Sequence, residues 1–231
     1  HSGRITVKNC SVHDCTIDTT NKNTGSTQYV GGIMALANGE VLCSITNCYV
    51  DGLKVKAELA SAVGGIGGIV GRTSSGCTLE NLYIVNSEIS SFFQYTGGIV
   101  GAIIGQTYAD GYVLRNVYVD ADISSLSDIL GGLVGYAQNV NNADSINALF
   151  LGDVYMRNEE FNYVSRYIGY QSSSTNLAKK GLYTFKEASF VNGRLNNEDR
   201  DDSDTRSKAD PYIYVSREDL CNPEFYTNGI K

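Results

Sequence analysis

The sequence predicts an all-β fold, specifically a right-handed parallel β-solenoid of about five coils with a C-terminal cap. The first observation is a glycine motif whose five copies end at residues 35, 71, 101, 135 and 169, at steps of 36, 30, 34 and 34 residues. The second is a short segment rich in β-branched and aromatic residues before each copy, which is typical of a strand. A fixed period of this size indicates a repeat architecture.

The glycine motif reads Gly-Gly-Ile/Leu-Val-Gly in its best copies. The copies occupy residues 31–35, 67–71, 97–101, 131–135 and, in degenerate form, 166–169. A glycine pair lets the chain bend tightly and lets neighbouring coils approach where a Cβ would clash. Units so rich in glycine and β-branched residues are poor helices. A propeller blade needs about 40–45 residues, so one solenoid coil per repeat fits these steps better.

The strand-like segments align into columns, as expected for coils stacked at about 4.8 Å. One apolar column contains Cys10, Cys48, Leu82, Val117 and Leu149. A second contains Val12, Val50, Ile84, Val119 and Leu151. In the first four units an asparagine precedes the residue of the first column, and stacking of these side chains predicts a hydrogen-bonded asparagine ladder of Asn9, Asn47, Asn81 and Asn116. In the fifth unit Ala148 aligns with them.

Two regions are predicted. Residues 4–185 form the solenoid repeat domain, in which 181–185 would be a sixth, capping strand. Residues 186–231 form an acidic loop, densest in charge at 196–204, and a C-terminal capping segment. Within that segment, Ser216 followed by Asp219 predicts the start of a short helix.

Composition restricts the classes of partner. The net charge is −7, with 18 Lys and Arg against 25 Asp and Glu, and no basic cluster is visible. Nucleic acids and anionic membrane surfaces are therefore not expected partners. No apolar run is long enough to span a bilayer, so this segment is not expected to insert into a membrane. Because the first Met is Met34, we expect a fragment of a larger chain.

The glycine copies, each preceded by an Asn-x-Tyr-Val type strand, resemble the GLUG repeats of bacterial cell-surface proteins. The resemblance covers residues 5–170 and extends to the features after the array, at 216–220, 225–226 and 229. Such repeats occur in bacterial immunoglobulin A peptidases and adhesin-like proteins. The resemblance implies a secreted or surface-displayed module for adhesion, ligand binding or spacing, with a host or bacterial surface glycan or protein as partner. It implies no active site.

Few residues suggest chemistry. His1 and His13 are the only histidines, which disfavours a histidine-dependent triad. In the repeat alignment Cys10 matches Cys48, and Cys43 matches Cys77. Three interpretations remain open: small inward hydrophobes, disulfides Cys10–Cys48 or Cys43–Cys77 in a secreted setting, and zinc. No catalytic, cofactor or metal site is expected.

A polysaccharide lyase or hydrolase of the β-helix type is the alternative function. An outward column of Thr16, Lys54, Glu88 and Asp122, with Asp120 on the same face, is its best support. The column places like charges on adjacent coils, and we expect it to hold a cation at most weakly. No Lys or Arg cluster accompanies these acids in the sequence, although an acidic substrate would need one.

Aromatic residues before the glycine motifs are the candidate ligand contacts. A shared row of rings there would provide a contact surface if it is exposed, although some of the rings could instead cap the core. The candidates are Tyr29, Phe92, Phe93, Tyr95, Phe161 and Tyr163.

Overall fold

The structure is a computed structural model of the 231-residue chain. It describes residues 3–19, 28–38, 42–57, 64–74, 76–92, 95–110, 113–126, 129–142, 147–157, 163–171, 176–177, 181–185, 190–192, 195–196 and 212–225.

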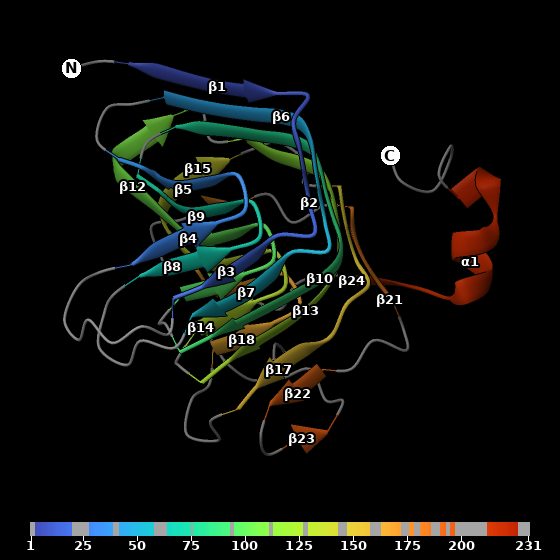
Figure 1. Cartoon of the computed structure of the whole chain (residues 1–231). Coiled ribbons are helices and arrows are strands. Elements are labelled where there is room, and N and C mark those ends of the chain that lie inside the picture. The colour runs from blue at the N-terminus through green and yellow to red at the C-terminus, as the bar shows by residue number, and fades with distance from the viewer. Residues whose placement is uncertain are drawn as a thin grey trace.

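The described chain winds into a parallel β-solenoid whose strands form three sheets (Figure 1). Nearly all neighbouring strands are parallel, and β22–β23 is the antiparallel exception among the described pairs. The predicted fold class is confirmed, with about four turns rather than about five coils. The five strands of the smallest sheet, β18-β14-β11-β8-β4, are separated by four turns.

The large sheet carries most of the strands. Its main path runs β1-β6-β10-β13-β16-β21-β24, and the shorter strands pair beside that path. Its described members are β1 (Arg4–Lys8), β2 (Ser11–His13), β3 (Thr16–Asp18), β6 (Leu42–Asp51), β7 (Lys54–Ala57), β10 (Cys77–Ser91), β13 (Val113–Ser125), β16 (Ala148–Phe150), β17 (Val154–Met156), β21 (Leu182–Phe185), β22 (Phe190–Asn192), β23 (Leu195–Asn196) and β24 (Tyr212–Val215).

Two smaller sheets close each coil. The five-stranded sheet contains β4 (Tyr29–Gly31), β8 (Gly65–Gly67), β11 (Tyr95–Gly97), β14 (Ile129–Gly131) and β18 (Tyr163–Ser165). The six-stranded sheet contains β5 (Met34–Ala37), β9 (Val70–Thr73), β12 (Val100–Asp110), β15 (Val134–Asn142), β19 (Ile168–Gln171) and β20 (Asn176–Leu177).

The glycine motif forms the bend between the two smaller sheets. The bends stack through backbone hydrogen bonds: Gly32 N–H donates to Gly68 O over 3.1 Å, and Gly68 N–H donates to Gly98 O over 2.9 Å. Gly98 N–H continues the series to Gly132 O at 3.1 Å. Because one backbone lies directly on the next, there is no room for a Cβ at these positions. The predicted role of the glycine pair is confirmed.

The core consists of the inward columns of the three sheets. Cys48, Leu82 and Val117 are buried and in register, as the alignment predicted. The fifth unit is shifted by one residue from the prediction, because Val117 pairs with Ala148 rather than with Leu149. The second column consequently ends at Phe150 instead of Leu151. Leu149 therefore points to the outer face, in register with Tyr118.

The asparagine ladder is confirmed. Asn47 Nδ2 donates to Asn9 Oδ1 at 3.2 Å, Asn81 Nδ2 to Asn47 Oδ1 at 2.9 Å, and Asn116 Nδ2 to Asn81 Oδ1 at 3.1 Å. All four have a left-handed backbone with φ between 52° and 57°, which Asn tolerates better than other side chains. Each ladder residue therefore both makes the bend and joins adjacent coils.

The ladder column continues into the fifth unit, where the sequence alignment placed Ala148. The shifted register brings Asn147, at φ 45°, opposite Asn116. The next residue in the column is Gly181, also at positive φ, and its Cβ position would collide with Asn147 Oδ1. A glycine thus keeps the same bend without a side chain.

Asn81→Ala is expected to lower the free energy of unfolding by about 1–3 kcal/mol, because Asn81 makes ladder bonds to both neighbouring coils. Asn9→Ala should cost less, since Asn9 makes only one ladder bond. Asn81→Ala both strains the left-handed backbone and removes the ladder bonds. Asn81→Gly removes the ladder bonds alone, because glycine accepts a positive φ without strain. Urea unfolding of the three variants is the measurement; equal losses at Asn9 and Asn81 would contradict the ladder's contribution.

One pair of cysteines links adjacent coils. Cys43 and Cys77 lie in register on β6 and β10, with Cα atoms 4.5 Å apart, and form a disulfide. Cys10, Cys15, Cys48 and Cys221 carry free thiols. Of the three interpretations of the cysteines, the disulfide therefore holds for this pair, although both side chains are also inward and buried.

The C-terminal segment lies against the outer face of the large sheet. After β24 a capping box at Ser216 and Asp219 starts helix α1 (Arg217–Cys221), confirming the predicted short helix. Leu220 and Phe225 pack on a small cluster that includes Leu149 and Tyr183. Figure 1 shows α1 to the side of β21 and β24. No helix among the described residues is long and apolar enough to cross a membrane.

Candidate binding site

Three predicted aromatic contacts share one column. Strand register aligns Tyr29 with Gly65, Gly65 with Tyr95, Tyr95 with Ile129, and Ile129 with Tyr163. All three tyrosines are half-buried rather than freely exposed. Whether they contact a ligand stays a prediction.

These tyrosines pack against side chains from the six-stranded sheet. The Tyr29 hydroxyl accepts a hydrogen bond from Arg72 at 3.0 Å, and the guanidinium lies 5.6 Å from the ring centroid. Tyr95 stacks on Tyr136 with centroids 4.4 Å apart. Tyr170 stacks on Tyr136 at 5.3 Å and meets Tyr163 edge-on at 5.0 Å. Burial first, then Tyr95 and Tyr170, raise the pKa of Tyr136.

Of the other predicted aromatic contacts, Phe92 lies among the described residues. Phe92 follows β10, and the Arg157 guanidinium lies 5.2 Å from its ring centroid. Phe93 and Phe161 lie outside the described residues.

The predicted acidic column is confirmed in its register. Lys54 pairs with Glu88, and Glu88 pairs with Asp122. The column also contains Asp153, whose backbone N–H donates to Asp122 Oδ1 at 3.2 Å. The sequence alignment missed Asp153 because it followed the strands only through the first four units.

The prediction that no Lys or Arg cluster accompanies these acids was wrong at Glu88. A surface cavity of about 370 Å³ is lined by Lys54, Lys56 and Arg157 together with Glu88 and Asp18. Arg157 comes from a later coil and is fixed there by hydrogen bonds from Nη2 to Ser90 Oγ at 3.2 Å and Ser91 O at 3.1 Å. We call these five residues the charged groove. Only the fold brings Arg157 to the two lysines, so sequence spacing could not reveal it.

Asp120 is half-buried beside Asp122, and burial first, then the charge of Asp122, raises its pKa. Because the folded-state pKa lies above the unfolded value, the ionised carboxylate lowers stability at neutral pH. That loss disappears as the pH falls through the raised pKa.

Asp120→Asn is therefore expected to raise the melting temperature at neutral pH, and by less near about pH 3, where the wild-type carboxyl is largely protonated. Thermal unfolding followed by circular dichroism at both pH values measures the effect. An equal gain at both pH values would contradict the assigned cause.

Among the described residues, no three His, Cys, Asp or Glu side chains are grouped closely enough to hold a metal ion. The weak cation candidates Glu88, Asp120 and Asp122 lie near one another along β10 and β13 without forming such a group.

The outer face of β6, β10 and β13 carries a second set of tyrosines that the sequence analysis did not select. Tyr49, Tyr83 and Tyr118 are in register, and we call them the tyrosine column. Tyr83 is 46% exposed, and its ring centroid lies 6.4 Å from that of Tyr118. A surface cavity of about 320 Å³ lies between this column and the asparagine ladder. The signal was present in the repeated Asn-x-Tyr spacing.

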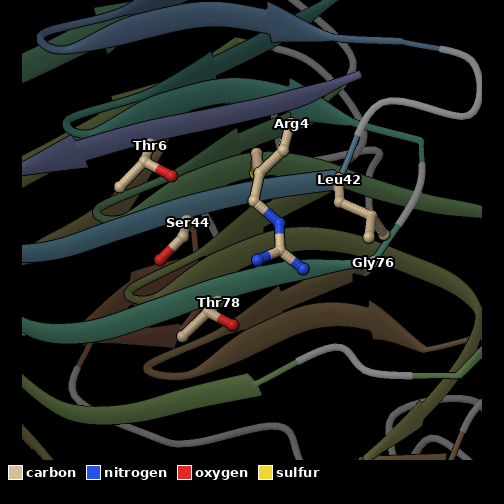
Figure 2. A pocket seen from close by; sticks show the side chains of 7 residues that line it. Arg4, Thr6, Leu42, Ser44, Gly76 and Thr78 are labelled. Carbon is tan, nitrogen blue, oxygen red and sulfur yellow. The ribbon is translucent and has the colours of Figure 1, made fainter. Parts of the chain in front are cut away.

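A larger cavity of about 450 Å³ lies farther along the same face. Thr6, Ser44 and Thr78 are in register there and form a row of hydroxyl side chains. Figure 2 shows Arg4 extending from β1 beside this row, between Ser44 and Leu42. The outer face therefore presents hydroxyl, amide and aromatic side chains in parallel columns.

No family model matches the chain, and neither the curated proteins nor the solved structures include a detectable relative.

Proposed function

We propose that the chain is a non-enzymatic binding module of a secreted or cell-surface protein, serving adhesion, ligand binding or spacing. The observation that carries this proposal is the outer face of β6, β10 and β13. Side chains from three neighbouring strands stand there in register, and Tyr83 is 46% exposed in the middle of the tyrosine column. A regular, exposed surface of this kind suits repeated contacts with a long partner.

The secreted setting is supported by the Cys43–Cys77 disulfide, since such bonds persist mainly in oxidising compartments. The resemblance to GLUG repeats supports the same setting and a parent protein of the bacterial surface. Under this proposal the partner is a glycan or protein of a host or bacterial surface.

The charged groove favours a second candidate, a β-helix polysaccharide lyase or hydrolase. It combines carboxylates, which could act as acid or base, with cations that could hold an acidic substrate. The supporting observation is the cavity that brings Glu88 together with Lys54, Lys56 and Arg157. Fold-level similarity to known β-helix enzymes adds only an analogy.

One experiment separates the two candidates. The purified protein is incubated with pectin, alginate and glycosaminoglycans, with and without calcium, and is also tested for binding to mucin and arrayed glycans. Binding without turnover supports the module. Turnover that Glu88→Gln abolishes would overturn it in favour of the enzyme.

A further inference from the structure

The groove between the tyrosine column and the asparagine ladder has the composition of a sugar-binding surface. Tyr83 and Tyr118 contribute ring faces, Asn81 and Asn116 contribute amides, and Leu149 lines one end. Ring faces pack against the C–H faces of sugars, while a primary amide can both donate and accept hydrogen bonds. A ligand with apolar faces and many hydroxyls satisfies both sets of groups.

The amides of the ladder retain hydrogen-bonding capacity. Asn81 uses one N–H toward Asn47 and one lone pair toward Asn116. Each primary amide has two N–H donors and two acceptor lone pairs, so the ladder occupies about half of them. The remaining N–H donor and acceptor lone pair of each ladder asparagine suit hydroxyl groups, which both donate and accept hydrogen bonds.

Around Tyr83 and Tyr118 the groove carries no formal charge at neutral pH. Its lining consists of asparagine, tyrosine, valine and leucine side chains. At the Tyr49 end the tyrosine hydroxyl donates to Asp51 Oδ2 at 3.2 Å. The nearest column on β10 and β13 contains Glu80 and Arg115, whose ion pair at 2.8 Å neutralises both charges. An uncharged ligand therefore avoids the desolvation of an uncompensated ion.

The groove also has a direction and an end. Its side chains repeat at the strand spacing of about 4.8 Å, which is close to the length of one pyranose unit in an extended chain. Beyond Tyr118 the column continues as Leu149 and Tyr183, which Leu220 and Phe225 cover. The cavity thus runs along Tyr118 and Tyr83, and the column continues beyond it to Tyr49.

We propose that this groove binds an extended neutral glycan lying along the stack of coils, with one sugar unit against each tyrosine of the column. This inference rests on the proposed binding function and names its ligand class. Affinity should rise with oligosaccharide length until the units match the tyrosines of the column, and then level off.

The test uses the full chain on an array of neutral and acidic glycans, followed by calorimetric titration of the best neutral oligosaccharides. Tyr83→Ala is expected to weaken binding about tenfold, through loss of the central ring. Tyr155→Ala is the matched control, because Tyr155 is 44% exposed on β17 outside the column, and should change affinity by less than about twofold. Circular dichroism confirms that both variants remain folded.

Three results would overturn the glycan proposal: equal effects of the two tyrosine variants, binding confined to acidic glycans, or binding confined to a protein. In each case the broader function survives, because a ligand is still bound without turnover. Failure to bind any glycan, mucin or protein surface would instead contradict the broader function as well.

A second inference rests on a different pair of residues, Cys10 and Cys48. Ser11 pairs with Tyr49 in the β2–β6 register, and Tyr49 N–H donates to Cys10 O at 3.0 Å, so the two cysteines occupy the same position on adjacent coils. Adjacent strands lie about 4.8 Å apart, within the Cα separation that a disulfide requires. Cys43 and Cys77 bridge the same kind of register pair.

The two thiols also point the same way. Cys10 Sγ donates to Lys8 O at 3.5 Å, and Cys48 Sγ donates to Thr46 O at 3.3 Å, so each side chain bonds the carbonyl two residues before it. Cys10 is exposed and Cys48 is buried. Burial raises the pKa of the Cys48 thiol. A hydrogen bond with the Cys10 backbone lowers this pKa, and the Cys10 thiol raises it. An external oxidant therefore reaches Cys10 first.

We infer that Cys10 and Cys48 form a second disulfide between coils when the protein meets a disulfide oxidant. Cys10 thiolate attacks oxidised glutathione, giving a Cys10–glutathione mixed disulfide and releasing one reduced glutathione. Cys48 then loses its proton and attacks Cys10 Sγ, releasing the second glutathione. Two protein thiols become one disulfide as one glutathione disulfide becomes two thiols. The bond would tie the first coil, whose Ile5 is 40% exposed, to the second.

Native protein is treated with oxidised glutathione, alkylated, and digested without reduction for mass spectrometry. We expect a Cys10–Cys48 linked peptide, with Cys221 still alkylated. The oxidised wild type should melt at a higher temperature, whereas Cys10→Ser should not respond to oxidant. Full alkylation of Cys10 and Cys48 after oxidation, with Cys43–Cys77 intact, would overturn the inference.

Discussion

Gly132→Val is expected to abolish folding or to lower the free energy of unfolding by about 3–5 kcal/mol or more. A Cβ at this position would collide with the Arg166 carbonyl oxygen and lie 3.0 Å from the Phe150 ring. The backbone has little freedom to move away, because Gly132 N–H donates to Ser165 O at 2.9 Å and its carbonyl accepts from Gly98. The melting temperature should fall by about 10 °C or more.

Gly3→Val is the matched control, since a Cβ at Gly3 meets nothing within 4 Å. It should leave the melting temperature nearly unchanged. Equal melting temperatures for Gly132→Val and wild type would refute the proposed packing of the glycine bends. We also predict that the 196–204 loop tolerates substitution; residues 197–204 lie outside the described residues.

Replacing both Cys43 and Cys77 with Ala is expected to cost about 3–4 kcal/mol, because the bond closes a loop across a sequence separation of 34 residues. Treating the wild type with a reductant should cause a similar loss. The same treatment should leave the double variant unaffected. Urea unfolding with and without reductant measures all three.

Cys221→Ala serves as the control for this prediction, because Cys221 is exposed on α1 and carries a free thiol. It should retain wild-type stability and the full response to reductant. A double variant as stable as the wild type would show that the disulfide does not stabilise the stacked coils.

The repeat made the fold predictable because the same residues form the same bends in successive coils. The glycine pair marks the bend, and the asparagine marks the left-handed turn that also bonds to its neighbours. The predicted register was wrong in the fifth unit, where the hydrophobic pattern aligned Leu149 with Val117. The backbone requirement for positive φ selects Asn147 instead, so following that requirement would have given the correct register.

The candidate sites were less predictable because they depend on contacts between coils. The column of Tyr29, Tyr95 and Tyr163 follows from spacing, but its packing against Tyr136 and Tyr170 does not. The shielding of Leu149 depends on Leu220 and Phe225, which fold back from the C-terminal segment. No local sequence pattern predicts that the C-terminal segment packs on Leu149.

The most direct test of the central claim is to map the bound ligand by nuclear magnetic resonance, using isotope-labelled protein and the tightest-binding arrayed glycan. The account predicts that shifted amide signals cluster at Asn81, Tyr83 and Asn116, on the outer face of β10 and β13. Shifts clustered instead at Lys54 and Glu88, in the charged groove, would contradict it.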